Sequence, residues 1–304
     1  MAQATDITRP QTDGPLARAG RQQHFRSQWE MMGRRLIANR LAVAGGIIVL
    51  LMILMAVLAP LIAPTDPVEM ELSDKLLPPS QAHLFGTDEF GRDVFSRVVW
   101  GGRISLRVGV IAVGIGMIAG SVIGLFAGYF GRWFDMLSQR VIDVMLAFPD
   151  LILALAIVAV LGPSLSNVMI AIGIGSIPIY ARVMRGQVLV LREKEYVEAA
   201  RAAGAGHLRL VFRHILPNAL SSIVVIATLG IASAILAGAG LSFIGMGAQP
   251  PSPEWGAMLA TGRQFLRNEW WIATFPGLFI ATTVLGFNLF GDGLRDALDP
   301  RGFR

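Results

Sequence analysis

The chain contains no cysteine among its 304 residues, so neither a disulfide nor thiolate chemistry can contribute to its fold or function. Its four histidines are scattered without the spacing of metal ligands, and we expect no metal site. Charged residues make up only 15% of the chain, against about 25% in ordinary soluble domains. Hydrophobic residues reach 54%, and this combination excludes a typical soluble protein of this length.

Lysine is almost absent as well. Lys75 and Lys194 each follow an acidic residue, whereas a phosphate-binding P-loop needs a Gly-rich turn that ends in Gly-Lys-Ser/Thr. We therefore expect that this chain neither binds nor hydrolyses ATP and is not an enzyme. If the function of this chain is driven by ATP, another polypeptide hydrolyses the ATP.

Long apolar runs take the place of the missing charges. Charge-free runs cover residues 41–63, 108–131 and 270–291, and a helix of about 20 residues crosses a bilayer. The run 215–253 ends in Gln-Pro-Pro-Ser-Pro, so one span and an outer loop fit it better than two spans. Residues 144–181 contain one charge, Asp150, and break at a Gly-Pro turn at 162–167, which favours a hairpin of two spans. The sequence thus predicts an all-α membrane protein with six transmembrane helices.

The distribution of arginine and lysine predicts the orientation. Of the 26 basic residues, 19 lie in residues 1–40, 131–140, 181–214 and the C-terminal tail, whereas residues 64–98 carry seven acidic residues. By the positive-inside rule, both termini lie in the cytoplasm. Forty mostly polar residues precede the first apolar run, so we expect no cleavable signal peptide. The net charge of +5 reflects this topology and does not indicate nucleic-acid binding.

One polar segment between two spans carries a specific motif. It reads Glu198-Ala-Ala-Arg-Ala-Ala-Gly204, with Leu216-Pro217 twelve residues later. Alanines favour a short helix, Gly204 permits the positive φ that ends it, a second short helix fits residues 207–215, and Pro217 suits the start of a span. The motif resembles the EAA loop of ABC importer permeases, which docks into a groove of the ATPase subunit. The resemblance assigns this coupling to Glu198, Ala199, Ala200, Gly204, Leu216 and Pro217.

His214 departs from the family pattern, which has an aliphatic residue at that position. The competing interpretation of the segment is an Ala-rich amphipathic loop helix without a partner. Glu198 could then merely pair with Lys194, one helical turn away.

Two further stretches are similar to the dipeptide, oligopeptide and glutathione branch of these permeases, as is the ending at residues 288–300. The first, residues 83–106, is interpreted as a helix on the outer membrane surface, capped by Thr87 or Asp88, with Val94 and Val98 on its apolar face. The second, residues 247–258, is a proline-stiffened turn whose Trp255 suits the membrane interface. The resemblance covers roughly residues 36–301.

The resemblance implies the type I ABC importer permease fold and a division of the chain. Residues 1–40 form a cytoplasmic tail, 41–63 the first transmembrane helix, and 64–100 a periplasmic loop with the surface helix. Residues 101–292 form a permease core of five spans, and 293–304 a cytoplasmic tail.

The resemblance also implies partners: a second homologous permease, two ATPase subunits that hold ATP and magnesium, and a periplasmic substrate-binding protein. The site of action is the bacterial inner membrane, in contact with lipid. The implied function is a translocation path for di- or oligopeptides or glutathione, and nickel or another small solute is the alternative cargo. Whether the second permease is a copy of this chain stays open. A secondary transporter, the alternative of another class, would show inverted repeats or a relay of buried charges, and neither is evident.

Charges at membrane depth are candidates for the path. A carboxylate in mid-span costs about 2.5–3.5 kcal/mol on insertion scales, so Asp143 and Asp150, seven residues apart on one helical face, should face protein or water. They either line the path or serve structure, Asp150 by bonding to the backbone freed by Pro149 and Asp143 by pairing with Arg140. Arg103 and Arg107, at the outer end of the second span, either anchor that span or face the path.

Four glycines recur every four residues within the second span: Gly116, Gly120, Gly124 and Gly128. Ridges of small residues let helices approach closely where lipid supplies no hydrophobic drive, so these predict a packing face. Its partner is either another span of this chain or the second permease.

The predicted topology is testable because the chain has no cysteine of its own. We expect Lys75→Cys to react with an impermeant maleimide in intact cells, because the acidic loop lies outside. Gly20→Cys and Ala200→Cys should react only after the membrane is permeabilised. Labelling of Ala200→Cys in intact cells would contradict the topology.

Overall fold

The computed structural model describes residue 33 and residues 36–298, so most of the predicted N-terminal tail and the last six residues lie outside it. Within the described residues every regular element is a helix, which confirms the all-α prediction. Five helices are long and apolar enough to cross a membrane, or six if the bent pair α6–α7 is one span. The helices are α3 (Arg40–Val57), α4 (Ala59–Ile62), η1 (Leu72–Asp74), α5 (Val94–Phe130), α6 (Arg132–Leu146), α7 (Asp150–Leu161), α8 (Leu165–Leu191), α9 (Glu195–Ala202), α10 (His207–Arg209), η2 (Leu210–Ile215), α11 (Leu216–Phe243), α12 (Trp255–Gly262), η3 (Arg263–Phe265) and α13 (Trp271–Leu298).

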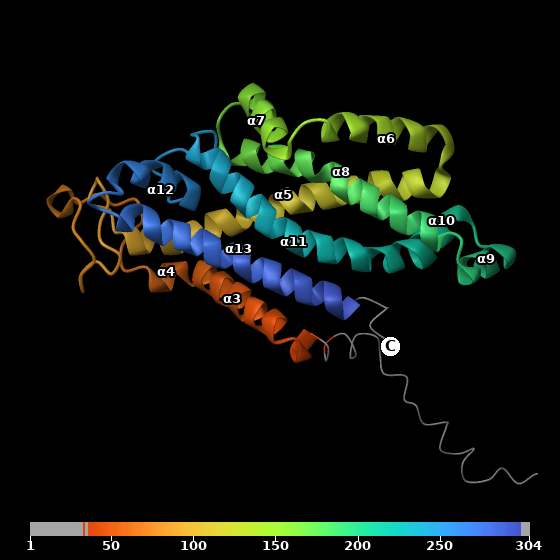
Figure 1. Ribbon diagram of the computed structural model, residues 1–304, viewed down its shortest axis with the longest axis horizontal. Coiled ribbons are helices and arrows are strands. Elements are labelled where there is room, and N and C mark those ends of the chain that lie inside the picture. Colours follow the sequence, from red (N-terminus) through yellow and green to blue (C-terminus); the bar gives the residue numbers. More distant parts are fainter. Residues whose placement is uncertain (1–32, 34–35, 299–304) are drawn as a thin grey trace, which may run out of the picture.

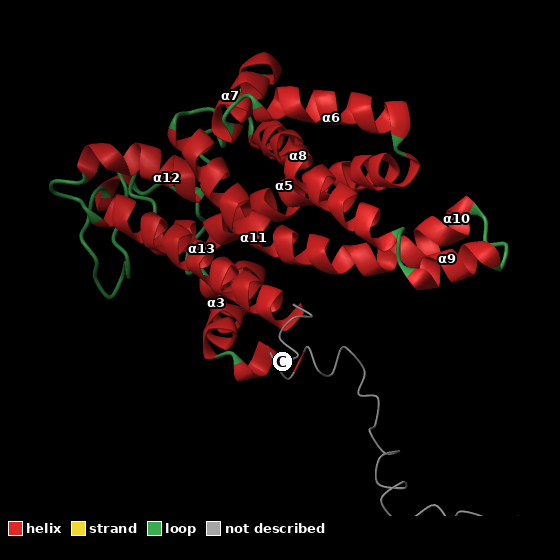
Figure 2. Cartoon of the chain, turned by 45° about the vertical axis from the view of Figure 1, so that its right-hand side comes forward, coloured by secondary structure: helices red, strands yellow, loops and turns green. Residues whose placement is uncertain are grey.

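The long helices form an elongated bundle (Figure 1). α5 packs against α8 more extensively than any other two described elements do, α11 contacts both, and α13 joins α3 to α11. The loop before α5 gathers with α12 at one end of the molecule, here called the α12 end. The α9–α10 loop projects from the opposite end, the α9 end (Figure 2).

The glycine ridge of α5 faces α8 of the same chain, which decides the question that the sequence left open. All four glycines are buried. A Cβ placed on Gly120 would lie 2.5 Å from the Ile177 carbonyl oxygen and 2.7 Å from the Cβ of Tyr180. Because glycine alone leaves this space, the two backbones pack directly against each other.

The start of α5 corrects two expectations. α5 is one helix of 37 residues, so the described residues 83–106 contain no separate surface helix, and the predicted boundary at residues 100/101 falls inside α5. Asp93, and not Thr87 or Asp88, caps the helix by accepting a hydrogen bond from the Ser96 amide at 2.8 Å. Val94 and Val98 are fully buried among α12 and α13 residues. Their apolar face therefore reflects burial in protein and not contact with a membrane surface.

Trp255 is also buried and does not lie at an interface. Its Nε1 donates a hydrogen bond of 2.8 Å to the Val98 carbonyl, which fixes α12 to α5. The neighbouring Glu254 caps α12 by accepting from the amides of Gly256 and Ala257, and Ser105 donates to it at 3.4 Å. Burial raises the pKa of Glu254 above its ordinary value. These contacts join α5 and α12 at the α12 end.

The third span differs from the predicted hairpin of two spans. α6 and α7 meet at a bend of 91° before Asp150. α7 has 12 residues, about 18 Å at 1.5 Å per residue, which is too short to cross a bilayer core of about 30 Å. The predicted six spans therefore require α6 and α7 to count as one broken span. Because of this bend, Asp143 and Asp150 lie on different helices and do not share a face.

The glycine ridge generates a stability prediction. Gly120→Leu should lower the thermal stability of the purified chain in detergent, because overpacking a tight contact typically costs about 1–3 kcal/mol. Gly114 is the matched control on the same helix, since a Cβ there meets nothing within 4 Å. Gly114→Leu should leave the melting temperature unchanged or higher. Equal melting temperatures for the two variants would contradict the packing role.

Candidate functional site

The loop at the α9 end covers residues 195–217 and begins with α9. The turn at Gly204 ends this helix, as the sequence predicted. Gly204 has φ +83°. Its amide donates to the Arg201 carbonyl and the Ala205 amide donates to the Ala200 carbonyl, each at 3.0 Å. This pair of hydrogen bonds is the Schellman motif, which satisfies carbonyls at a helix C-terminus. A side chain at Gly204 would meet no other atom within 4 Å, so glycine is needed for its backbone conformation alone.

The second half of the loop differs from the separate short helix that was predicted at 207–215. α10, η2 and α11 are continuous from His207 to Phe243. η2 is a π-helix, in which the Leu216 amide bonds to the Val211 carbonyl five residues back. Pro217 follows directly and supplies no N–H. The loop is therefore physically continuous with α11.

The inner side of the loop is fixed to the bundle. Val197, Leu210 and Ile215 are buried. The hydroxyl of Tyr129, near the end of α5, is 2.8 Å from His207 Nδ1, and Arg192 donates at 3.0 Å to the Gly128 carbonyl. These contacts make the loop a supported projection of the fold.

The outer side of the loop is exposed and partly apolar. Glu198, Ala199, Gly204 and Pro217 are exposed, and Ala200 and Leu216 are half-buried. Within the described chain Glu198 forms no salt bridge, so the alternative pairing with Lys194 is absent.

Sequence reasoning missed two exposed side chains in the loop. Leu208 is 73% exposed and Phe212 is 53% exposed. Their signal was a pair of large apolar residues at i and i+4, the spacing that places two side chains on the same face of a helix. Exposed apolar groups on a supported projection are typical of a docking surface.

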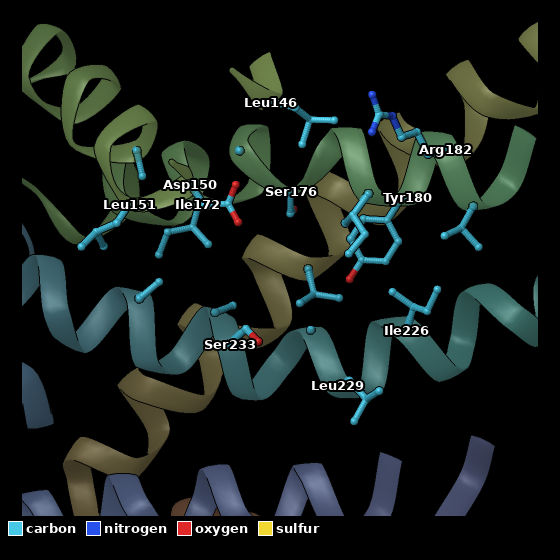
Figure 3. Close-up of a pocket in the computed structure, with 18 residues that line it drawn as sticks. Leu146, Asp150, Leu151, Ile172, Ser176, Tyr180, Arg182, Ile226, Leu229 and Ser233 are labelled. Atoms are coloured by element: carbon cyan, nitrogen blue, oxygen red, sulfur yellow. The ribbon is translucent and has the colours of Figure 1, made fainter. Parts of the chain in front are cut away.

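A cavity of about 590 Å³ opens between α7, α8 and α11 (Figure 3). Most of its lining is aliphatic. The polar lining residues are Asp150, Ser176, Tyr180, Arg182 and Ser233. The two serines and Tyr180 were not among the predicted site residues. A polar side chain within an apolar span could have indicated each of them.

The structure places only one of the four predicted path residues at this cavity. Asp150, the first residue of α7, lines it and forms no salt bridge with the described residues. Asp143 lies outside the lining and pairs with Arg182 at 2.6 Å, and not with Arg140. Arg103 and Arg107 are exposed on α5 away from the cavity, and the guanidinium of Arg103 lies 5.1 Å from the Trp100 ring centre.

Ion pairs hold α6 along α8 beside the cavity. Arg185 binds Asp135 through two hydrogen bonds of 2.6 and 2.7 Å. The Arg182–Asp143 pair adds a second tie, although both of its side chains are about half exposed. Bidentate arginine–carboxylate pairs have defined geometry, so they set the orientation of α6 against α8.

Comparisons with known proteins agree with this architecture. Residues 120–304 match the family described as binding-protein-dependent transport system inner membrane component, and residues 27–79 match the N-terminal TM domain of oligopeptide transport permease C. The chain is 52% identical over 275 residues to the dipeptide transport system permease protein DppC of Alkalihalophilus pseudofirmus, covering 90% of each chain. It is 47% identical over 282 residues to the glutathione transport system permease protein GsiD of Pectobacterium atrosepticum, covering 92% of this chain and 94% of that one.

Among solved structures, an inward-facing MetNI methionine ABC transporter aligns with a TM-score of 0.53 and 20% identity, covering 67% of this chain and 98% of that one. At this identity the likeness shows the fold alone. The secondary-transporter alternative finds no support in these matches. The chain belongs to the family of inner membrane components of binding-protein-dependent transport systems, as a permease subunit of an ABC importer.

Proposed function

We propose that this permease carries dipeptides, oligopeptides or glutathione through the cavity between α7, α8 and α11. The cavity supports this because its volume of about 590 Å³ lies within the usual range of small-molecule sites, about 300–1,000 Å³. Its carboxylate, Asp150, has no cationic partner in the described chain and suits the ammonium group of a peptide. The curated relatives named as dipeptide and glutathione permeases favour this cargo over nickel.

The α9–α10 loop is the proposed coupling surface for an ATPase subunit, as the resemblance of its motif implied. The exposed side chains of Leu208 and Phe212 supply apolar anchors, and the small side chains around Glu198 permit a close approach. ATP and magnesium then belong to the partner, and this chain carries out no covalent chemistry.

The proposed assembly contains this chain, a second homologous permease, two ATPase subunits and a periplasmic binding protein. In the proposed orientation both termini lie in the cytoplasm, as the charge asymmetry of the sequence predicts. The α9 end then faces the cytoplasm, and the opposite α12 end faces the periplasm. When the ATPase subunits bind ATP and close, they move the loop, and the cavity opens toward the periplasm. Hydrolysis of the ATP returns the cavity to its original orientation.

The coupling role is tested by two glycines in the same loop. Gly204→Val should abolish uptake of a labelled dipeptide, because a β-branched residue at φ +83° costs about 1–2 kcal/mol and distorts the loop. Gly206 is the control, since its φ is −69° and a Cβ there also meets no atom within 4 Å. Gly206→Val should transport normally.

Membrane abundance of both glycine variants, measured by immunoblot, should match the unchanged chain. Copurification of the ATPase subunits should fall for Gly204→Val alone. Normal uptake by Gly204→Val would rule out this loop as the coupling element.

The role of Asp150 is tested by comparing free and N-acetylated dipeptides. Asp150→Asn should raise the KM for the free peptide about two- to fivefold, the usual size for a partly exposed ion pair, and leave the acetylated peptide unaffected. Asp292→Asn, which alters an exposed carboxylate on α13 outside the cavity lining, is the control. An unchanged preference for the free ammonium group in Asp150→Asn would refute the assignment.

A further inference from the structure

A cluster of three residues joins the coupling loop to α11. The backbone carbonyl of His214, in the π-helix η2, accepts a hydrogen bond of 2.7 Å from Asn218 Nδ2. The hydroxyl of Tyr196, on α9, donates to the same carbonyl at 3.4 Å. Asn218 Nδ2 also lies 3.3 Å from the Tyr196 hydroxyl. We call this group the His214 clamp.

The clamp exists because the helix is irregular at this point. Pro217 has no N–H to donate, and the preceding turn has π geometry, so the regular ladder of backbone hydrogen bonds is interrupted. Interruptions of this kind are where helices bend. Side chains that bond to the backbone there restore part of the lost stiffness.

The clamp lies on a direct route from the loop to the cavity. Tyr196 is in the helix that carries Glu198, and Asn218 is in the first turn of α11. Farther along α11, Ile226, Leu229 and Ser233 line the cavity (Figure 3). Other contacts of the loop, Tyr129–His207 and Arg192–Gly128, lead to α5 instead.

We propose that Asn218 and Tyr196 are positioning residues for transport, which lock α9 to the base of α11 so that a displacement of the loop moves the cavity wall. Without the clamp, the π-helix bends and absorbs the displacement. The proposal rests on the proposed function in one respect, that an ATPase subunit drives the loop.

The test uses the whole transporter, with its ATPase and permease partners, in proteoliposomes. Spin labels on Ser233→Cys in α11 and Ile179→Cys in α8, both lining the cavity, report the distance between the two walls. This chain has no native cysteine to compete for the label, and the partner subunits are used in cysteine-free form. The distance distribution is measured without nucleotide and with ATP plus vanadate. Hydrolysis and uptake of alanyl-alanine are measured in parallel on unlabelled protein.

Three variants separate positioning from folding. Asn218→Asp keeps the shape and removes the donor, and combined with Tyr196→Phe it removes both bonds to the His214 carbonyl. Asn218→Ser keeps a donor that can bond to the carbonyl four residues back, so it should rescue part of the function. Thr228→Val is the control, because it deletes a side-chain bond to the Val224 carbonyl elsewhere on α11.

We expect the Asn218→Asp/Tyr196→Phe variant to copurify with the ATPases and hydrolyse ATP, while its nucleotide-driven distance change is lost. Its ratio of uptake to hydrolysis should fall about two- to tenfold, the range for a lost hydrogen bond. Asn218→Ser should lie between this variant and the unchanged chain, and Thr228→Val should behave as the unchanged chain.

Two results would overturn the clamp: a full distance change in the double variant, or loss of ATPase copurification in it, which would make the role purely structural. Absence of any nucleotide-driven change in the unchanged chain would instead refute the proposed coupling function. Failure of that chain to take up alanyl-alanine, with the distance change present, would exclude only this dipeptide as cargo and would leave the clamp supported.

Discussion

Four glycines on α5 bring its backbone against that of α8, and the remaining helices are placed by this contact. Lipid tails are as apolar as the side chains, so moving a side chain from lipid into the bundle yields little free energy. Close packing and internal hydrogen bonds therefore hold the helices together. α5 runs from the α12 end to the α9 end and contacts functional elements at both. α8 supplies one wall of the cavity and continues toward α9. A larger side chain at Gly120 would separate these two helices and alter both ends at once.

Polar groups are concentrated where the bundle must be fixed at its ends. At the α12 end, Asp88 pairs with Arg92 at 2.7 Å, and the Trp271 indole donates to the Thr87 carbonyl at 3.1 Å. These groups are buried, so their partners must be present to offset the cost of removing them from water. The long loop before α5 is consequently held together internally and fixed to α13.

The α9 end is built differently, because it combines a supported inner side with an exposed outer side. The Schellman turn at Gly204 ends α9 sharply, and α10 then runs into α11 without a break. A surface that docks a partner and also moves the distant cavity wall needs a defined shape at the contact and a stiff connection to α11. The π-helix before Pro217 is the weak point of this connection, and the side chains of Tyr196 and Asn218 meet there.

Local chemistry determined much of what could be known from the sequence. Charge-free runs located the long helices, and the Ala-rich segment before Gly204 located the loop, since hydropathy and turn preference depend on neighbouring residues. The tertiary structure decided what depends on contacts between distant segments. Val94 and Trp255 looked like surface groups but pack in the interior, Asp143 pairs with Arg182 on another helix, and α6 and α7 meet at a sharp bend. An amphipathic pattern shows that one face is covered but not by what, because lipid and protein both accept the same apolar side chains.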